Sequence, residues 1–340
     1  MEEEFPANET GLNDGEGLPV LPFLPPTEEP SSVTLAISVA LVGCLTIAIC
    51  GNASQIVLQI YTRRLSRKIP AQAFIAILLF INFLLPLGLP SVILEKLVRI
   101  WMFGRVSCHA HHMLTTAGRV VIPWTITVLH AFSAMFLTRP NRLTRMEGML
   151  ASAAFCGLLV LVLAIVIPQG MAAELELIRK DEIDSEQYIM LIHTYRCFLK
   201  PELYPVRRTA KFAFEFAVPL LIALYFHLQI GSSSKLASRR AVSKNLICIV
   251  IIHYMCNVLY YAPDEHRKLL FAMLPDDADP QQLLPFLSPT LIWYPLSQLS
   301  AALSRCNMDK IEDDRSRSRV TGGRGNDIER SHLMKHNLDS

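Results

Sequence analysis

Two residues of opposite charge lie within otherwise apolar stretches of the sequence. Arg119 lies eleven residues after Cys108, and Glu215 lies four residues before Pro219. A charge buried in an apolar environment is costly unless it has a partner, and removing one member of a buried pair is strongly destabilising. Arg119 and Glu215 therefore either pair with each other for structural reasons or contact a ligand. The sequence favours both interpretations about equally.

Three further polar residues complete a candidate ligand site with this pair: Thr115, His112 and Asn257. His112 belongs to a cluster with His109 and His111, but these spacings do not place three side chains on one helix face. A zinc site is therefore disfavoured, and we interpret the three histidines as solvated. His130, His227 and His253 are interpreted as packing residues, and no nucleophile accompanies His253 and Asn257. We expect no enzymatic activity, no metal and no cofactor.

Composition indicates a membrane protein. Of the 340 residues, 51% are hydrophobic and only 18% are charged, and the mean hydropathy is +0.34. Because a membrane helix needs about 20 apolar residues, the hydropathy pattern predicts an all-α bundle of seven transmembrane helices. The seven spans are residues 33–61, 71–97, 107–137, 149–173, 208–231, 244–262 and 282–303.

The charges of the short loops predict the orientation. Eleven Lys and Arg residues follow the first and third spans and join the fifth to the sixth, against one acid, Glu147. Since basic loops stay in the cytoplasm, the N-terminus is expected outside and the C-terminus inside. Arg139, Arg142, Arg239 and Arg240 would then face the cytoplasm.

The predicted bundle, residues 33–303, has a polar segment on either side. Residues 1–32 are acidic, contain no Lys or Arg, and are expected to form a disordered outer tail without an evident signal peptide. Asn8 begins a glycosylation sequon in this tail. Residues 304–340 form the inner tail, which could begin with a short amphipathic helix at 304–311. Cys306 there is either a lipidation site or a free thiol.

The eight cysteines predict one disulfide. Cys44, Cys50, Cys156, Cys248 and Cys256 fall within the apolar spans, and Cys306 lies on the predicted inner side. Only Cys108 and Cys197 face the oxidising side, so we expect them to pair and to hold the long loop 174–207 over the third span.

The pattern Trp101-x-Phe103-Gly104-x-x-x-Cys108 ahead of an apolar helix resembles rhodopsin-like G-protein-coupled receptors. Four further features match that family's layout: Gly51-Asn52, Asn82 at the usual span-two acid, Pro219 in span five, and Tyr294-Pro295 in span seven. The resemblance implies a seven-helix receptor fold and the same disulfide.

Several receptor motifs are altered. Phe132-Ser133-Ala134 occupies the position of the family's Asp-Arg-Tyr, Cys256-Asn257-Val258-Leu259 that of its Cys-Trp-x-Pro, and Asn82 is neutral. The chain thus resembles a divergent member, of an invertebrate neuropeptide-receptor or chemoreceptor branch. Thr115 replaces the acid of amine receptors, which argues against an amine ligand.

The expected function is that of a plasma-membrane receptor that signals through a heterotrimeric G protein. Because acidic residues dominate the predicted outer loops, a cationic peptide is the favoured ligand; solvated loops without this role are the alternative. Ser133 and the inner arginines would face the G protein. A non-signalling decoy or a chemosensory receptor stays open, and a transporter is less favoured because the two halves show no repeat.

Overall fold

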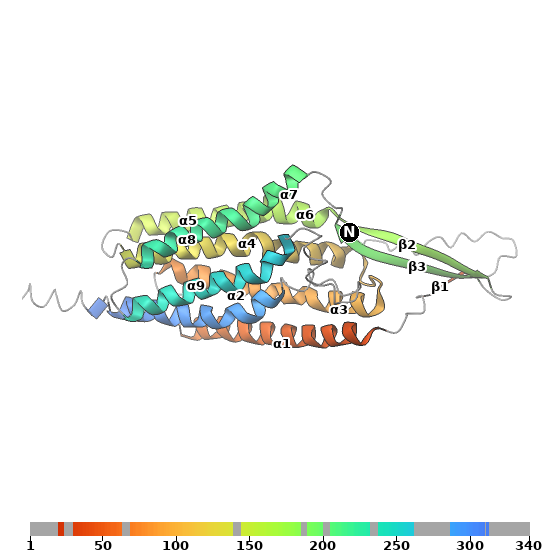
Figure 1. Cartoon of the computed structure of the whole chain (residues 1–340), viewed down its shortest axis with the longest axis horizontal. Helices are drawn as coiled ribbons and strands as arrows, with labels where there is room; N and C mark the ends of the chain where they lie inside the picture. Colours follow the sequence, from red (N-terminus) through yellow and green to blue (C-terminus); the bar gives the residue numbers. More distant parts are fainter. Residues whose placement is uncertain are drawn as a thin grey trace, which may run out of the picture.

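The computed structural model describes residues 20–23, 30–62, 69–138, 144–184, 189–199, 205–231, 237–261, 286–309 and 311–312. Long helices dominate this part of the chain (Figure 1). They are α1 (Ser32–Tyr61), α2 (Pro70–Leu84), α3 (Leu89–Val98), α4 (Gly104–Thr138), α5 (Thr144–Leu161), α6 (Ile167–Met171), α7 (Pro205–Phe212), α8 (Val218–Gly231) and α9 (Ala237–Val258). Residues 286–309 form a further helix.

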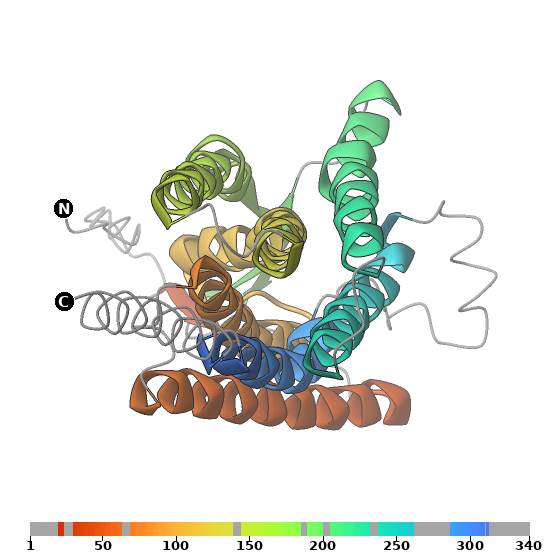
Figure 2. The same cartoon turned by 90° about the vertical axis from the view of Figure 1, so that its left-hand side faces the viewer.

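Helix α4 lies at the centre of the bundle. In its most apolar part, 72% of the residues are buried, against 22% in α1 and 11% in the helical segment Gly148–Met171. Viewed along the bundle, α4 is surrounded by the other helices (Figure 2). A residue on α4 can therefore face several helices at once, which makes this helix the natural place for a site.

The outer faces of the bundle are apolar. Val39 and Val57 on α1, Leu221 on α8 and Met255 on α9 are each about two-thirds exposed. Exposed apolar side chains on many helices require an apolar surrounding, and six helical segments are long and apolar enough to cross a membrane. The fold is a helical membrane bundle.

The six segments agree with the first six predicted spans, apart from their ends. The sixth begins at Ala237 instead of residue 244, because Val242 is buried and continues the core-facing side of α9 one turn further. Helix 286–309 packs Leu296, Leu299 and Leu303 into the same core. It continues without a break past residue 303, the predicted end of the seventh span, into the segment predicted as the inner tail.

Prolines interrupt several of these helices. A proline has no N–H to donate to the carbonyl four residues earlier. Pro86 lies in a short 3₁₀ segment, η1 (Leu85–Gly88), between α2 and α3. A π-helical segment precedes Pro168, η2 (Val162–Val166), and another precedes Pro219, η3 (Ala213–Ala217).

The fold is not purely helical. The loop between α6 and α7 forms an antiparallel hairpin of β2 (Ala173–Asp184) and β3 (Ile189–Leu199), and β1 (Val20–Phe23) pairs with β3 in parallel. The hairpin extends from one end of the bundle, called here the sheet end (Figure 1). We predicted only an outer loop, although the alternation Glu174-Leu175-Glu176-Leu177 has the two-residue period of a strand.

Buried amides connect the helices in the core. Asn52 Nδ2 donates to the carbonyls of Ala48 (2.8 Å) and Pro289 (3.1 Å), and so links α1 to helix 286–309. Gln72 Nε2 donates to the carbonyl of Ser300, whose hydroxyl donates back to Gln72 Oε1 at 2.8 Å. Such pairing offsets the cost of burying amides in an apolar core.

Gly51 allows α1 to approach helix 286–309 closely. A Cβ added at Gly51 would lie 2.6 Å from Nε1 of Trp293, whereas one added at Gly43 on the same helix would meet nothing within 4 Å. The contact between the two helices therefore depends on the missing side chain.

We predict that Gly51→Ala lowers the thermal unfolding midpoint of the detergent-solubilised protein relative to Gly43→Ala. Replacing glycine by alanine in a helix raises the free energy of unfolding by about 1 kcal/mol in both variants. In Gly51→Ala, the added methyl group also clashes with Trp293, which lowers the free energy of unfolding by about 1–3 kcal/mol. Fluorescence-detected thermal unfolding measures the difference. Equal midpoints for the two variants would show that the helices do not meet at Gly51.

Candidate ligand site at the sheet end

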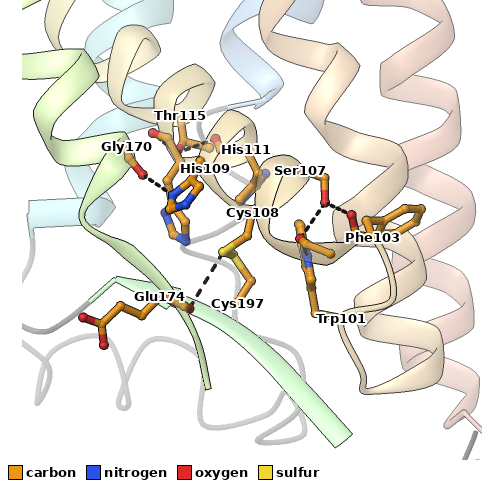
Figure 3. The surroundings of a disulfide bond; sticks show 12 residues. Trp101, Phe103, Ser107, Cys108, His109, His111, Thr115, Gly170, Glu174 and Cys197 are labelled. Carbon is orange, nitrogen blue, oxygen red and sulfur yellow. Dashed lines mark hydrogen bonds between the residues drawn. A yellow bond between two sulfur atoms is a disulfide. The ribbon is translucent and has the colours of Figure 1, made fainter. Parts of the chain in front are cut away.

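The disulfide between Cys108 and Cys197 holds the hairpin over the start of α4. Its S–S distance is 2.02 Å and its Cα–Cα distance 5.6 Å, as the sequence analysis predicted for this pair. Cys108 Sγ also lies 3.8 Å from the carbonyl oxygen of Glu174 on β2 (Figure 3). The hairpin thus covers the sheet end of α4.

Trp101 strengthens this connection. Its side chain is 2% exposed, and its indole N–H donates to the carbonyl of Gly104 at 2.9 Å. Its backbone N–H donates to the carbonyl of Tyr195 on β3. Trp101 packs in one small core with the disulfide and Ala173. The Trp-x-Phe-Gly motif therefore contributes to holding the hairpin in place.

Arg119, eleven residues after Cys108 on α4, forms an ion pair with Glu215. Arg119 Nε lies 3.8 Å from Glu215 Oε2, and the two residues are 8% and 3% exposed. This separation makes an ion pair but exceeds hydrogen-bond distance, and Arg119 Nε has no hydrogen-bond acceptor within the described part of the chain. The pair joins α4 to η3, and its loose geometry leaves hydrogen-bonding capacity unused.

Two tyrosines that the sequence analysis did not single out complete the site. The Tyr261 hydroxyl donates to Glu215 Oε2 at 2.8 Å, and the guanidinium carbon of Arg119 lies 4.7 Å from the centroid of the Tyr260 ring. Both tyrosines lie in η4 (Leu259–Tyr261), a 3₁₀ turn that follows α9. Three helical segments therefore contribute to one charged cluster. In the sequence, the feature that could have indicated these residues is a pair of adjacent tyrosines at the end of the predicted sixth span.

Each charged residue lies four residues before a proline, Pro123 and Pro219 respectively. The carbonyls of Arg119 and Glu215 thus lack the usual amide donor of an α-helix. At Glu215 the helix widens, and the Val218 N–H donates to the carbonyl of Ala213, five residues back. π-helical turns of this kind are frequent at functional sites.

The prolines also lie near the point where α4 packs on α8. Thr127 Oγ1 is 2.9 Å from the carbonyl oxygens of both Pro123 and Pro219, and donates to them. Pro219, predicted to have a structural role, thus takes part in the contact that holds Glu215 beside α4.

His112 and Thr115 lie on α4 between the disulfide and Arg119. The Thr115 hydroxyl donates to the backbone carbonyls of His111 and His112, so its proton is already engaged. The His112 side chain is half-buried, and its Nε2 has no partner. The three histidines are therefore less solvated than predicted; His109 Nδ1 donates to the carbonyl of Gly170 at 3.1 Å.

A ring nitrogen of His112 and the sulfurs of Cys108 and Cys197 lie within 4.8 Å of one another. Both sulfurs are oxidised in the disulfide, so neither is a thiolate that could bind a metal. This is the only such cluster within the described residues. It does not form a metal site in this state of the protein.

Asn257 lies apart from these contacts. Its Nδ2 donates to the carbonyl of His253 at 2.8 Å, and His253 Nδ1 lies 3.3 Å from Ser288 Oγ. Asn82 is completely buried, and among the described residues neither atom of its side-chain amide has a hydrogen-bond partner. The structure joins Arg119 to Glu215, whereas the described contacts of Asn257 and Asn82 do not include either of them.

At the opposite end of the bundle, Ser133 is completely buried, and its hydroxyl has no hydrogen-bond partner in the described ranges. Arg240 is exposed at the start of α9, next to the half-buried Arg239. Cys306 is 9% exposed and packs in the main core, so lipidation would require it to become accessible. In helix 286–309, Tyr294 is 59% exposed and Pro295 is buried.

Three predicted site residues, Asn8, Arg139 and Arg142, lie outside the described residues.

The chain is similar to a protein named Neuropeptide receptor 18 of Caenorhabditis elegans. The two are 23% identical over 188 residues, which are 53% of this chain and 39% of the relative. The match thus spans less than half of that receptor's length. No family model matches the chain. This distant likeness and the helical membrane fold are consistent with a receptor of the G-protein-coupled type.

We predict that Cys108→Ser combined with Cys197→Ser destabilises the protein by about 4 kcal/mol, because the bond closes a loop with a sequence separation of 89 residues. Thermal unfolding of the solubilised protein measures the loss. Cys50→Ser is the matched control, since Cys50 is an exposed free thiol. A midpoint as high as that of the control would mean that the disulfide does not hold the hairpin.

We also predict that Glu215→Gln destabilises the protein by about 3 kcal/mol, because it leaves the buried charge of Arg119 without its partner. Adding Arg119→Gln should restore much of this loss, since the second change removes the unmatched charge. A double-mutant cycle on unfolding midpoints measures the coupling. Additive effects of the two changes would contradict direct pairing.

Proposed function

We propose that this protein is a plasma-membrane receptor of the rhodopsin-like class, which binds a peptide at the sheet end and signals through a heterotrimeric G protein. The observation that carries the proposal is the Arg119–Glu215 pair beneath the hairpin. Buried charges with unused hydrogen-bonding capacity are costly in a membrane protein, and a ligand group placed between them would use that capacity.

The orientation follows from the distribution of basic residues. Arg239 and Arg240 lie at the end of the bundle opposite to the hairpin, and basic short loops stay in the cytoplasm. With that end inside, helix 286–309 is the seventh span and the disulfide lies in the oxidising compartment. The hairpin then covers the outer mouth of the bundle.

A peptide ligand is favoured over a small amine. Thr115 is neutral, and its hydroxyl is engaged by the backbone of its own helix, so it offers no counter-ion to an ammonium group. The distant relative is named as a neuropeptide receptor. Exposed acids on β2, Glu174 and Glu176, would attract a peptide with cationic side chains.

Signalling would proceed by a shift in population between two arrangements of the bundle. Arg119 and Glu215 join α4 to the α7–α8 segment, and Tyr260 and Tyr261 join both to α9. A ligand that changes these contacts would alter how the three helices pack. The opposite ends of these helices, with Arg239 and Arg240, would form the G-protein surface.

A non-signalling receptor is the second candidate. Ser133, at the position of the family's charged Arg, is completely buried and has no hydrogen-bond partner. A receptor that binds peptide but lacks this charge would hold its ligand without activating a G protein.

The test is a panel of G-protein sensors in cells that express the protein at their surface, challenged with a peptide library. We expect a ligand-dependent response that Arg119→Ala removes by weakening ligand binding. Arg240→Ala should leave ligand binding unchanged, because only Arg119 lies in the ligand site. Saturable binding without a response from any sensor would favour the non-signalling receptor. The absence of both binding and response, at normal surface expression, would overturn the proposal.

A further inference from the structure

The charged cluster at the sheet end has a hydrogen-bonding pattern that selects a particular ligand group. Arg119 Nε–H is a buried donor that finds no acceptor among the residues that the structure describes. Glu215 Oε2 receives one hydrogen bond, from Tyr261, whereas a carboxylate has about four acceptor positions. The cluster therefore offers one free donor next to spare acceptor capacity.

The net charge of the cluster excludes the simplest ionic ligands. Arg119 and Glu215 carry opposite charges that cancel, and they contact the uncharged side chains of Tyr260, Tyr261 and Thr116. A ligand carboxylate would gain Arg119 but meet Glu215, and a ligand ammonium would gain Glu215 but meet Arg119. Like charges placed side by side in a buried site cost several kcal/mol.

We propose that the Arg119–Glu215 couple binds a primary carboxamide of the ligand. The carboxamide oxygen accepts from Arg119 Nε–H, and its N–H donates to the Glu215 carboxylate. A primary carboxamide offers both a hydrogen-bond donor and an acceptor and carries no net charge. It therefore supplies the acceptor that Arg119 Nε–H lacks without adding a charge to the Arg119–Glu215 pair. This inference rests on the proposed peptide-receptor function and names the chemical group that the site recognises.

The surroundings favour this geometry. Arg119 Nε and Glu215 Oε2 lie 3.8 Å apart, beyond hydrogen-bond distance, so the two groups do not satisfy each other's hydrogen bonds. Pro219 has no N–H to donate to the backbone carbonyl of Glu215, and the helix around Glu215 is a π-helical turn. Phe212 and Phe216 stack at 5.4 Å and both contact Tyr261, which provides an apolar wall for the rest of the ligand.

A primary carboxamide in a peptide has two sources, an amidated C-terminus and an Asn or Gln side chain. The test therefore uses a peptide library in which every sequence is made as the C-terminal carboxamide and as the free carboxylate. For each active peptide, every Asn and Gln is also replaced by Asp or Glu. Binding is measured by competition on intact cells that express the protein.

In the wild-type protein, we expect at least one of these amide-to-acid changes to weaken binding by about tenfold or more. Glu215→Gln makes the site net positive, so in this variant the acid form should bind as well as the amide or better. Glu176→Gln removes one exposed acid from the hairpin, and should leave the ratio of amide to acid affinity within about threefold of wild type. This control separates the buried couple from general repulsion of acids by the outer surface.

Should Glu215→Gln not reach the cell surface, Arg119→Gln gives the opposite test. The site is then net negative, and the preference for amide over acid should widen.

If no change from amide to acid affects binding by more than threefold in the wild-type protein, the carboxamide assignment is overturned and the receptor proposal stands. It is likewise overturned if the preference persists unchanged in both variants. If no peptide binds, the receptor proposal fails and the assignment fails with it.

Discussion

The ion pair between Arg119 and Glu215 is the constraint on which the arrangement of the site depends. Neither charge could be left alone in an apolar bundle without a penalty of several kcal/mol, so α4 must keep facing the segment that carries Glu215. Tyr261 and Tyr260 bind to opposite members of the pair and bring the end of α9 to the same place. The positions of three helices are therefore linked through one cluster of four side chains.

The same cluster lies where the backbone is least regular. Pro123 and Pro219 have no N–H to donate to the backbone carbonyls of Arg119 and Glu215, four residues earlier. In addition, the π-helical segment η3 widens the helix around Glu215. Thr127 joins the two proline-containing turns by donating to both proline carbonyls. In the proposed receptor, these turns are where the bundle would adjust while its other helices stay packed.

Hydropathy and cysteine position were sufficient to predict much of this structure. The first six spans are confirmed to within a few residues at most ends, because about 20 apolar residues can satisfy their backbone in a membrane only as a helix. The bond between Cys108 and Cys197 is confirmed because the other cysteines lie in apolar spans or at the opposite end. The pairing of Arg119 with Glu215 was foreseen as one of two outcomes, since burial makes a partner necessary.

The contacts of Tyr260 and Tyr261 could not be predicted in the same way. They depend on the 3₁₀ turn after α9 and on how that turn packs against α4, and neither is encoded in a local pattern. The hairpin was missed although its strands alternate, because the loop was considered only as a connection between spans. The function of Ser133 and of the inner arginines stays a prediction.

Proximity of Arg119 and Glu215 in the membrane is the most direct test of this account. Cysteines introduced at both positions, in a background where the free cysteines are replaced by serine or alanine, would be treated with a short thiol-specific cross-linker. A protease site placed between β3 and α7 leaves Cys108 and Cys197 in the same fragment, so only a bond between positions 119 and 215 would keep the two fragments joined after cleavage. The account predicts efficient cross-linking of this pair and none between position 119 and a cysteine at Leu221, which faces outward on α8. Separate fragments for the 119–215 pair, with both thiols shown to be reactive, would contradict it.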